Sequence, residues 1–166
     1  MFRRCWPIYL CLALCGSAHA QRWRMQYFYD QNDSTLTVLD LRFSSARHGV
    51  ATGYITRKDR DKPTVLLTED GGTNWTLVPV KEAGVSVFLL DDKLGWMAGS
   101  KKIWKTEDGG RVWRQQKALE DVQSLYFLDA EHGWAAAAQK KVFETRDGGE
   151  HWTELAAALP IHVENF

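Results

Sequence analysis

Cysteine is scarce in this sequence and confined to its beginning. The chain of 166 residues has three cysteines, and all of them, Cys5, Cys11 and Cys15, precede residue 16. From residue 21 onward there is no thiol, which excludes disulfide bonds and thiolate metal sites from that part of the chain. Its stability must therefore come from packing and hydrogen bonding.

An excess of charge of one sign is also missing. The chain carries 21 basic and 21 acidic side chains, for a formal net charge of zero. Proteins that bind nucleic acids or anionic membranes usually show a basic patch, so the composition favours neither as a partner. Hydrophobic residues make up 45% of the sequence, which is enough for a sizeable buried core and argues against disorder.

No apolar run is long enough to cross a bilayer core, which takes about 20 residues in a helix. The run at residues 7–14 follows two arginines and precedes Ala-His-Ala at residues 18–20, a cleavage site of small residues. We therefore interpret residues 1–20 as a cleaved signal peptide and expect an exported protein, periplasmic or extracellular, with no integral membrane segment after cleavage. The alternative of a lipoprotein modified at Cys15 is disfavoured because the bulky Leu14 precedes it.

Catalytic and cofactor motifs are absent from the sequence as well. It contains no Gly-rich phosphate loop, no pair of histidines at metal-binding spacing and no Gly-x-Ser-x-Gly elbow. The five histidines are scattered, and His48 and His132 occupy equivalent positions of a repeat. We therefore expect no enzyme, no metal site and no cofactor.

The sequence does contain an internal repeat. Residues 68–75 read TEDGGTNW, residues 106–113 read TEDGGRVW and residues 145–152 read TRDGGEHW. The aspartates of successive copies lie 38 and 39 residues apart, and each copy follows a second shared element with a polar turn and then Gly-Val or Gly-Trp. A period near 40 residues is typical of repeat architectures, so the repeat decides the fold class.

Alternating apolar residues between these elements, as at residues 103–106, indicate strands. Each repeat therefore predicts four short antiparallel strands, which matches one blade of a β-propeller. The second strand should begin at the Gly-Val or Gly-Trp pair, the third should end at the threonine of the octapeptide, and the fourth should begin at its tryptophan. We expect an all-β fold of three blades, at residues 36–80, 81–118 and 119–158.

Both ends of the repeat region predict incomplete blades. Trp23 and the alternating residues after it look like a fourth strand without its turn, so we expect an N-terminal closing strand and turn at residues 21–35. Residues 159–166 match the opening strand of a truncated fourth blade. Because closed propellers commonly have about four to eight blades, we expect an open, partial propeller that is the N-terminal part of a larger one and can self-associate through open blade edges. Residues 57–63, an extra run of mixed charge, we interpret as a solvated loop rather than a binding site.

The turn within the octapeptide has a structural explanation. Asp-Gly favours tight hairpin turns because glycine adopts positive φ without steric cost. The aspartate can accept hydrogen bonds from amides two or three residues ahead, the threonine hydroxyl can join that network, and the indole supplies apolar area that would pack between neighbouring sheets. We assign this structural role to Thr68, Asp70, Gly71, Gly72, Trp75, Thr106, Asp108, Gly109, Gly110, Trp113, Thr145, Asp147, Gly148, Gly149 and Trp152.

The functional alternative is that Asp70, Asp108 and Asp147 are catalytic carboxylates or calcium ligands. A calcium loop places several oxygen donors at alternate positions before a glycine, and Thr-x-Asp-Gly-Gly lacks them. The structural interpretation is therefore the stronger one.

The sequence Thr-x-Asp-Gly-Gly-x-x-Trp resembles the Asp-box, or BNR, repeat of sialidases, sortilin-type receptors and photosystem II assembly and stability factors. Paired with an upstream Gly-Trp and small residues, as at residues 95–99, it is most similar to the photosystem II assembly factor branch, over residues 36–166. The resemblance implies a seven-bladed, non-catalytic propeller that acts as a protein-binding or assembly module. A photosystem II subunit as partner, and the thylakoid lumen as location, would follow only for a photosynthetic source.

Two other hypotheses remain open. A glycan-binding protein or a degenerate sialidase-like glycoside hydrolase would share the repeat, but the Arg-x-Pro element of sialidases is missing, since residues 60–63 read Arg-Asp-Lys-Pro. Most tryptophans are explained by their place in the repeat, which weakens a sugar-stacking role. The last hypothesis is a remnant without function.

Overall fold

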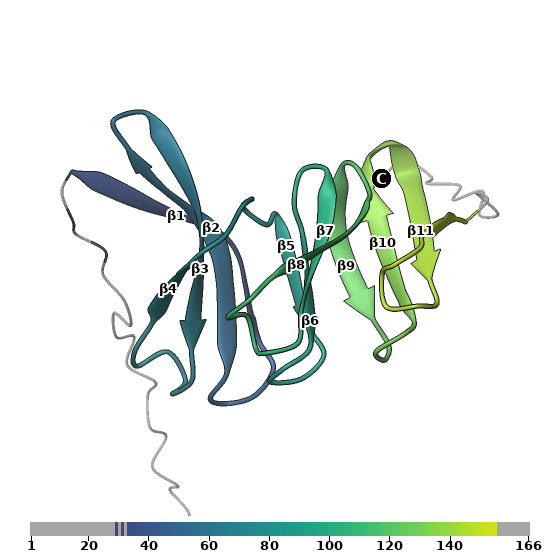
Figure 1. The fold of residues 1–166 in the computed structure, drawn as a ribbon, viewed down its shortest axis with the longest axis horizontal. Helices are drawn as coiled ribbons and strands as arrows, with labels where there is room; N and C mark the ends of the chain where they lie inside the picture. The colour runs from purple at the N-terminus through teal and green to yellow at the C-terminus, as the bar shows by residue number, and fades with distance from the viewer. Residues whose placement is uncertain (1–28, 30, 32, 156–166) are drawn as a thin grey trace, which may run out of the picture.

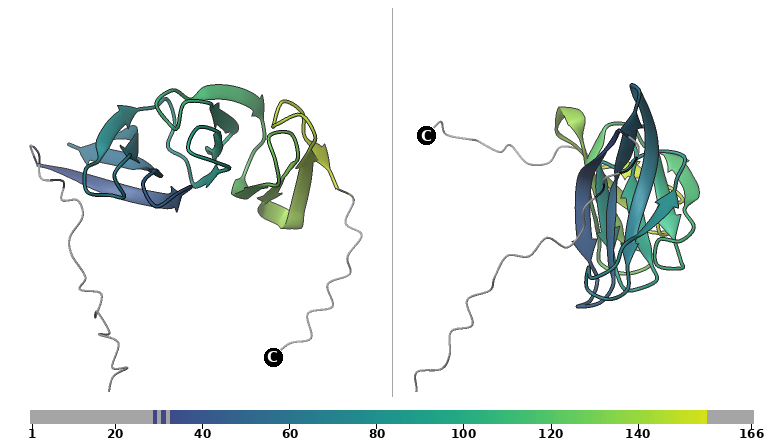
Figure 2. Two further views of the ribbon diagram at one scale, coloured as in Figure 1. Left: turned by 90° about the horizontal axis from the view of Figure 1, so that it is seen from below. Right: turned by 90° about the vertical axis from the view of Figure 1, so that its left-hand side faces the viewer.

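The computed structural model describes Tyr29, Gln31 and residues 33–155. In this part of the chain twelve strands form three four-stranded antiparallel sheets, which stand side by side in a curved row (Figure 1, Figure 2). The predicted all-β fold of three open blades is confirmed. The predicted signal peptide, most of the predicted closing strand and the predicted opening of a fourth blade lie outside the described residues.

Each sheet is a meander in which every strand pairs with the next along the chain. Blade 1 contains β1 (Ser34–Phe43), β2 (Gly49–Arg57), β3 (Arg60–Thr68) and β4 (Thr76–Pro79). Blade 2 contains β5 (Ser86–Leu89), β6 (Gly95–Ala98), β7 (Lys102–Thr106) and β8 (Arg114–Ala118). Blade 3 contains β9 (Val122–Phe127), β10 (Gly133–Ala137), β11 (Lys141–Thr145) and β12 (Thr153–Glu154), with a 3-10 turn η1 (Ala138–Lys140) before β11.

The second strand of every blade begins at the glycine, and the third ends at the threonine, as the sequence predicts. These two residues face each other in register in all three sheets, for example Gly133 opposite Thr145. The glycine is required there because a Cβ on Gly133 would lie 2.4 Å from the Phe127 ring. The fourth strands begin one residue later than predicted, because the tryptophan still belongs to the loop.

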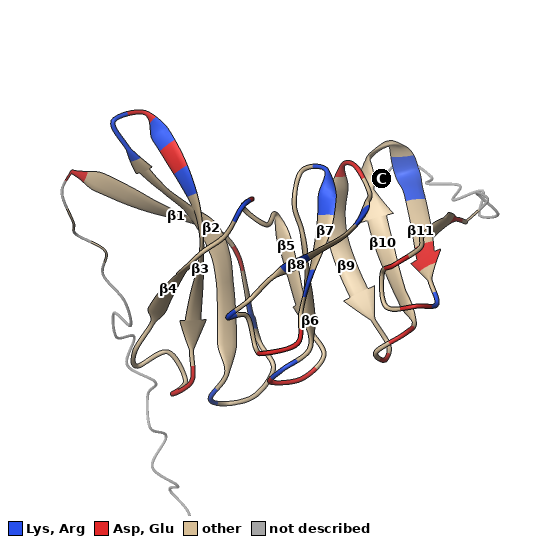
Figure 3. Ribbon diagram, in the orientation of Figure 1, with Lys and Arg blue, Asp and Glu red and all other residues tan. Residues whose placement is uncertain are grey.

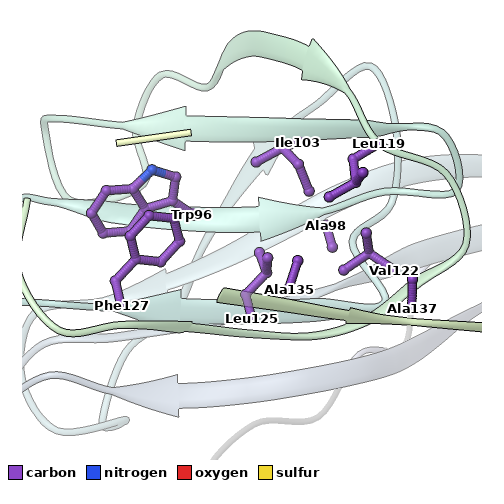
Figure 4. Close-up of a cluster of buried hydrophobic side chains, with 9 residues drawn as sticks. All are labelled: Trp96, Ala98, Ile103, Leu119, Val122, Leu125, Phe127, Ala135 and Ala137. Carbon is purple, nitrogen blue, oxygen red and sulfur yellow. The ribbon is translucent and has the colours of Figure 1, made fainter. Parts of the chain in front are cut away.

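The core lies between the sheets, because side chains alternate between the two faces of each strand. We call the face toward the preceding blade the N-face and the face toward the following blade the C-face. The C-face of blade 1 and the N-face of blade 2 form one cluster of buried residues, Val50, Val65, Leu67, Val87, Met97 and Trp104. The C-face of blade 2 and the N-face of blade 3 form the other (Figure 4), with Trp96, Ala98, Ile103, Leu119, Val122, Leu125, Phe127, Ala135 and Ala137.

The hairpin of β2 and β3 is longer than its counterparts and projects beyond them (Figure 1). Its tip carries exposed side chains of both signs (Figure 3). The interpretation of residues 57–63 as a loop is wrong, because the ladder continues to the pair Arg57 and Arg60. Lys58 and Asp59 make the turn with φ of 47° and 56°. Within the described part of the chain no helix has the length and apolar character needed to span a bilayer.

Polar groups add to the contact between blades 1 and 2. Asp40 Oδ2 accepts a hydrogen bond from the Val87 amide at 2.9 Å, and the buried Thr52 hydroxyl donates to the Gly84 carbonyl at 2.8 Å. These bonds connect the first two strands of blade 1 to the start of blade 2. They thereby fix the position of the two apolar faces relative to each other.

Glu82 lies on the linker between the two blades and organises the β6–β7 hairpin. Its carboxylate accepts hydrogen bonds from the Ser100 amide at 2.8 Å, the Ser100 hydroxyl at 2.6 Å and the Trp104 indole N–H at 3.0 Å. Burial raises the pKa of Glu82, but these hydrogen bonds bring it below its ordinary value. With the Lys101 amide at 3.4 Å, the side chain is a charged acceptor for four donors.

Replacing this acceptor tests its importance. Glu82→Ala should lower the free energy of unfolding by about 1 to 3 kcal/mol, because the donors of Ser100 and of the buried Trp104 lose their partner. Chemical denaturation of both proteins measures the difference, with Lys81→Ala at the adjacent exposed position as the control. Equal stability of wild type and Glu82→Ala would show that water replaces the carboxylate without loss.

Candidate functional site

Each repeated octapeptide forms a loop, which we call the box, between the third and fourth strands of its blade. The threonine that ends the third strand is only 1% exposed in every copy. In blade 2, Thr106 Oγ1 donates to Asp108 Oδ1 at 2.9 Å and accepts from the Gly110 amide at 2.8 Å. The same two bonds measure 3.0 and 2.8 Å in blade 1, and 2.8 and 2.9 Å in blade 3.

The aspartate closes the loop from its other side. Its Oδ1 accepts from the amide four residues ahead in every box, namely Asn74 at 2.8 Å, Val112 at 2.9 Å and His151 at 2.8 Å. The sequence predicted donors two or three residues ahead, and only Arg111, at 3.1 Å from Asp108, fits that spacing. The loop is wider than predicted because it wraps around the carboxylate.

Both box glycines have positive φ in all three copies, between 71° and 98°, as Asp-Gly-Gly predicts. The box is nevertheless not the two-residue hairpin turn that Asp-Gly suggests. The amide of its first glycine bonds to the turn between the first two strands of the same blade, at Arg47 O (2.8 Å), Lys93 O (2.9 Å) and Glu131 O (2.8 Å). The loop is longer than a two-residue hairpin turn because this amide bonds to another turn of the blade and not within the loop.

The box tryptophans fasten the loop to the first strand of their own blade. The indole N–H of Trp75 donates to Gly72 O at 3.1 Å, and that of Trp113 donates to Gly110 O at 3.0 Å. The rings of Trp75 and Trp152 meet Phe43 and Phe127 edge to face, with centroids 6.1 and 6.0 Å apart. Trp113 and Trp152 also border the clusters between the sheets, where the sequence placed all three.

The boxes of blades 2 and 3 contact the blade before them. Trp96 Nε1 donates to Gly148 O at 2.7 Å in a buried bond between blades. A Cβ on Gly109 would lie 2.9 Å from the ring of the buried His48, and one on Gly110 would lie 3.1 Å from Val50. Glycine thus serves two purposes here, namely positive φ and close approach of neighbouring blades.

A second set of loop caps was missed in the sequence. In the turn between β9 and β10, Asp129 Oδ1 accepts from the amides of Glu131 at 2.8 Å and His132 at 2.7 Å. Asp91 and Ser45 cap the equivalent turns of the other blades in the same way. Their constant position, four residues before the shared glycine, was a signal that could have identified them.

Hydrogen bonds keep two carboxyl groups in the charged form, that of the turn cap Asp129 and that of the box residue Asp147. The amide and ring of His132 are the largest causes that lower the pKa of Asp129 to about 2. Burial raises the pKa of Asp147, but the amide and ring of His151 and the Thr145 hydroxyl outweigh it and lower the value to about 2. A carboxyl group so acidic is a poor general acid near neutral pH.

One group of side chains within the described residues has the spacing of metal ligands. Asp147, Glu150 and His151 bring one possible ligand atom each to within 4.8 Å of one another, and all three are exposed. His151 Nδ1 lies 2.7 Å from Asp147 Oδ2, so this pair already belongs to the hydrogen bonds of the box. The grouping follows from the loop geometry.

Beside the boxes lies a surface groove of mixed charge. One hollow of 590 Å³ is lined by Ser45, Arg47, His48, Glu69, Asp92, Lys93, Glu107, Asp108 and Arg111. A second hollow of 380 Å³ extends it toward blade 3 and is lined by Lys105, Glu107, Asp108, Val112, Arg114, Gln116 and Glu150. Arg111 pairs with Glu69 across the two blades, and Figure 3 shows both signs along these loops. We call the two hollows together the box-end groove.

Fold and loops together define a class, the Asp-box β-propeller, present here as an open arc of three blades. Among solved structures, "YCF48 bound to D1 peptide" is similar with a TM-score of 0.61 and 24% identity, over 74% of this chain and 40% of that chain. YCF48 from Cyanidioschyzon merolae has a TM-score of 0.61 and 22% identity, over 75% of this chain and 38% of that chain.

The GH74 enzyme of Niastella koreensis is similar with a TM-score of 0.60 and 13% identity, over 72% of this chain and 22% of that chain. No family model and no curated protein matches the chain. At these identities the likeness shows the fold, and the chain spans about 40% of the length of the two YCF48 chains.

The buried hydroxyl of the box allows a sharp test of its role. Thr106→Val keeps the shape of the side chain but leaves the Gly110 amide and Asp108 without the hydroxyl, so the free energy of unfolding should fall by about 1 to 3 kcal/mol. Thr73→Val is the matched control, because that exposed position holds arginine in blade 2 and glutamate in blade 3. Calorimetry measures both variants, and equal melting temperatures for the two would refute the role.

The low pKa of Asp147 predicts a pH dependence. A folded-state pKa of about 2, below the ordinary 3.8, means that the charged carboxylate stabilises the fold above about pH 4 and loses this effect as the pH falls toward 2. The melting temperature of Asp147→Asn should therefore lie below that of the wild type at neutral pH, and the gap should shrink between pH 4 and 2. Glu150→Gln, exposed in the same loop, should show no such gap. A gap that stays constant down to pH 2 would contradict the assignment.

Proposed function

We propose that this chain is an exported, non-catalytic protein-binding module of the Asp-box propeller class, which takes up a segment of its partner at the box-end groove. Export rests on the signal-peptide features of residues 1–20. Binding at loops beside a rigid sheet scaffold is the usual arrangement in such folds. The observation that carries the proposal is the composition of the groove.

Five acidic and five basic side chains line the two hollows. A polyanion such as nucleic acid would be repelled by half of them, whereas a polypeptide segment can place side chains of both signs opposite the complementary charges of the groove. Lys93, Arg47 and Glu107 are exposed. Arg47 Nε donates to Glu69 O at 3.2 Å and Glu107 pairs with Arg114 at 3.1 Å, so a bound segment would exchange these exposed contacts for its own. The groove therefore suits a protein ligand.

The box carboxylates support a non-catalytic role. Asp70, Asp108 and Asp147 each accept hydrogen bonds from a threonine hydroxyl and from at least one loop amide. A nucleophile or general acid would have to give up these bonds and open the loop. Their geometry supports the loop, which favours a structural role for these three carboxylates.

Similarity in fold to a YCF48 bound to a D1 peptide supports a peptide segment as the ligand class. Together with the resemblance of the repeats to photosystem II assembly factors, it makes a photosystem II subunit the partner to test first if the source is photosynthetic. In that case the location would be the thylakoid lumen, and otherwise the periplasm or the cell exterior.

Site-specific crosslinking tests the proposal. A photo-reactive amino acid in place of Lys93, in the groove, should form adducts with a partner protein in an extract of the compartment. The matched control places the same amino acid at Lys62, which is equally exposed on the projecting hairpin, and should give none. Absence of protein adducts at residue 93, or the same adducts from both positions, would contradict the proposal.

A glycan-directed function is the second candidate, since the GH74 enzyme has a similar fold. Sugar binding generally uses exposed aromatic rings, yet among the described residues the half-exposed aromatics Phe43 and Tyr126 lie on blade faces and not in the groove. A glycan array with purified chain and a fluorogenic sialoside assay separate the two. Saturable sugar binding or turnover would favour this candidate over protein binding.

A further inference from the structure

The contact between blades 2 and 3 shows how a C-face and an N-face recognise each other. Trp96 on the C-face of blade 2 stacks on Phe127 on the N-face of blade 3, with centroids 3.6 Å apart and planes at 5° (Figure 4). The same indole donates to Gly148 O at 2.7 Å. Stacking and a buried hydrogen bond thus converge on a single side chain.

The C-face of blade 3 repeats this arrangement, but no blade formed by the described residues packs against it. Trp134 stands at the position of Trp96, since both follow the shared glycine and face the first strand of their sheets. Val142 takes the place of the fully buried Ile103 and is 39% exposed, and Tyr126 takes the place of Phe88 and is 56% exposed. No hydrogen bond from the Trp134 indole is found within the described residues.

The N-face of blade 1 is the matching counterpart. Phe43 is equivalent to Phe127 and Leu41 to Leu125, because all four occupy the same places opposite the second strand. Phe127 and Leu125 are 1% and 5% exposed, whereas Phe43 and Leu41 are 46% and 43% exposed. Half-exposed apolar side chains in equivalent places mark an uncovered interface.

The hydrogen-bond acceptor is present as well. Gly71 in the box of blade 1 has the place and the positive φ of Gly148, 72° against 71°. Its amide is bonded to Arg47 O, as the Gly148 amide is to Glu131 O. The Gly71 carbonyl accepts no hydrogen bond from any described residue, so it can receive the Trp134 indole N–H.

Charges at the two faces are complementary. At the contact of blades 2 and 3, Lys105 Nζ lies 3.3 Å from where a Cβ on Gly148 would be, beside the turn that holds Glu131. Blade 3 has Glu144 at the position of Lys105, and blade 1 has Arg47 at the position of Glu131. The signs are exchanged, so the C-face of blade 3 and the N-face of blade 1 also place residues of opposite charge at these two positions. Lys105 and Glu144 each have a partner within their own blade as well, Glu107 and Arg146.

We propose that two copies of this chain pair head to tail, with the C-face of blade 3 of each copy packed on the N-face of blade 1 of the other, so that their six described blades form one ring. Closed propellers commonly contain about four to eight blades, so two copies fit this range and three, with nine blades, exceed it. In each contact Trp134 stacks on the Phe43 of the other copy and donates to its Gly71 O. This pairing is independent of the protein ligand proposed for the groove.

The mass of the full chain in solution tests the pairing. Sedimentation at micromolar concentration should give twice the mass of one chain. A monomer, or an assembly whose mass keeps growing with concentration, would overturn the proposal, because the first lacks the contact and the second does not close.

Variants on the two faces test its head-to-tail character. Phe43→Asp alters the N-face and also removes the contact with the Trp75 ring, and Val142→Asp alters the C-face. Each variant alone should be monomeric, since both contacts of the ring then contain one altered face. An equimolar mixture of the two should recover a dimer, because one of its contacts joins two unaltered faces. The recovery also shows that both variants are folded.

Val112→Asp is the control, because Val112 is 53% exposed in the box of blade 2, away from both faces, and should remain dimeric. Trp134→Phe keeps an aromatic ring but removes the indole N–H, and should weaken dimerisation by about a hundredfold, about tenfold for the hydrogen bond lost in each of the two contacts. A dimer disrupted by Val142→Asp but not by Phe43→Asp would mean that like faces pair, and would overturn the proposal. So would a mixture that stays monomeric.

Discussion

One buried threonine hydroxyl per blade holds the box end of this fold in place. Thr68, Thr106 and Thr145 each join an aspartate to the amide of the second box glycine. A buried polar group without a partner costs about 1 to 3 kcal/mol, so the loop adopts the one conformation that satisfies all of them. Once it is closed, the amide of the first glycine bonds to the turn between the first two strands of its blade, and in blade 3 the carbonyl of this glycine accepts from Trp96 of blade 2.

The two contacts between blades pack equivalent faces against each other, but with different residues. Between blades 2 and 3, Trp96 combines stacking and a hydrogen bond in one side chain. Between blades 1 and 2 its place is taken by Val50, which can only pack. The polar bonds of Asp40 and Thr52 set the register there, and they have no equivalent at the contact of blades 2 and 3.

The repeat predicted the fold because period, alternation and turn residues all pointed to four-stranded blades. It located the glycine and threonine strand ends correctly, since both are fixed by local backbone geometry. It missed the hydrogen bond from the first box glycine to the turn between the first two strands of the blade. It also missed the caps at Ser45, Asp91 and Asp129, and the role of Glu82. These depend on which segments the fold brings together, and a pattern along one chain does not specify that. The groove could not be predicted for the same reason, because Glu69 and Arg111 meet only when blades 1 and 2 pack.

In this account the boxes are supports, and the two surfaces proposed for recognition are held in place by them: the groove at the loop end and the faces at the two ends of the arc. The central claim is that the hydroxyl of each box threonine binds the amide of its second glycine. Hydrogen exchange of the Gly72, Gly110 and Gly149 amides measures it most directly, because these amides lie outside every strand ladder. Exchange as slow as in the central strands is predicted. Exchange as fast as at the exposed Thr73 amide would contradict the account.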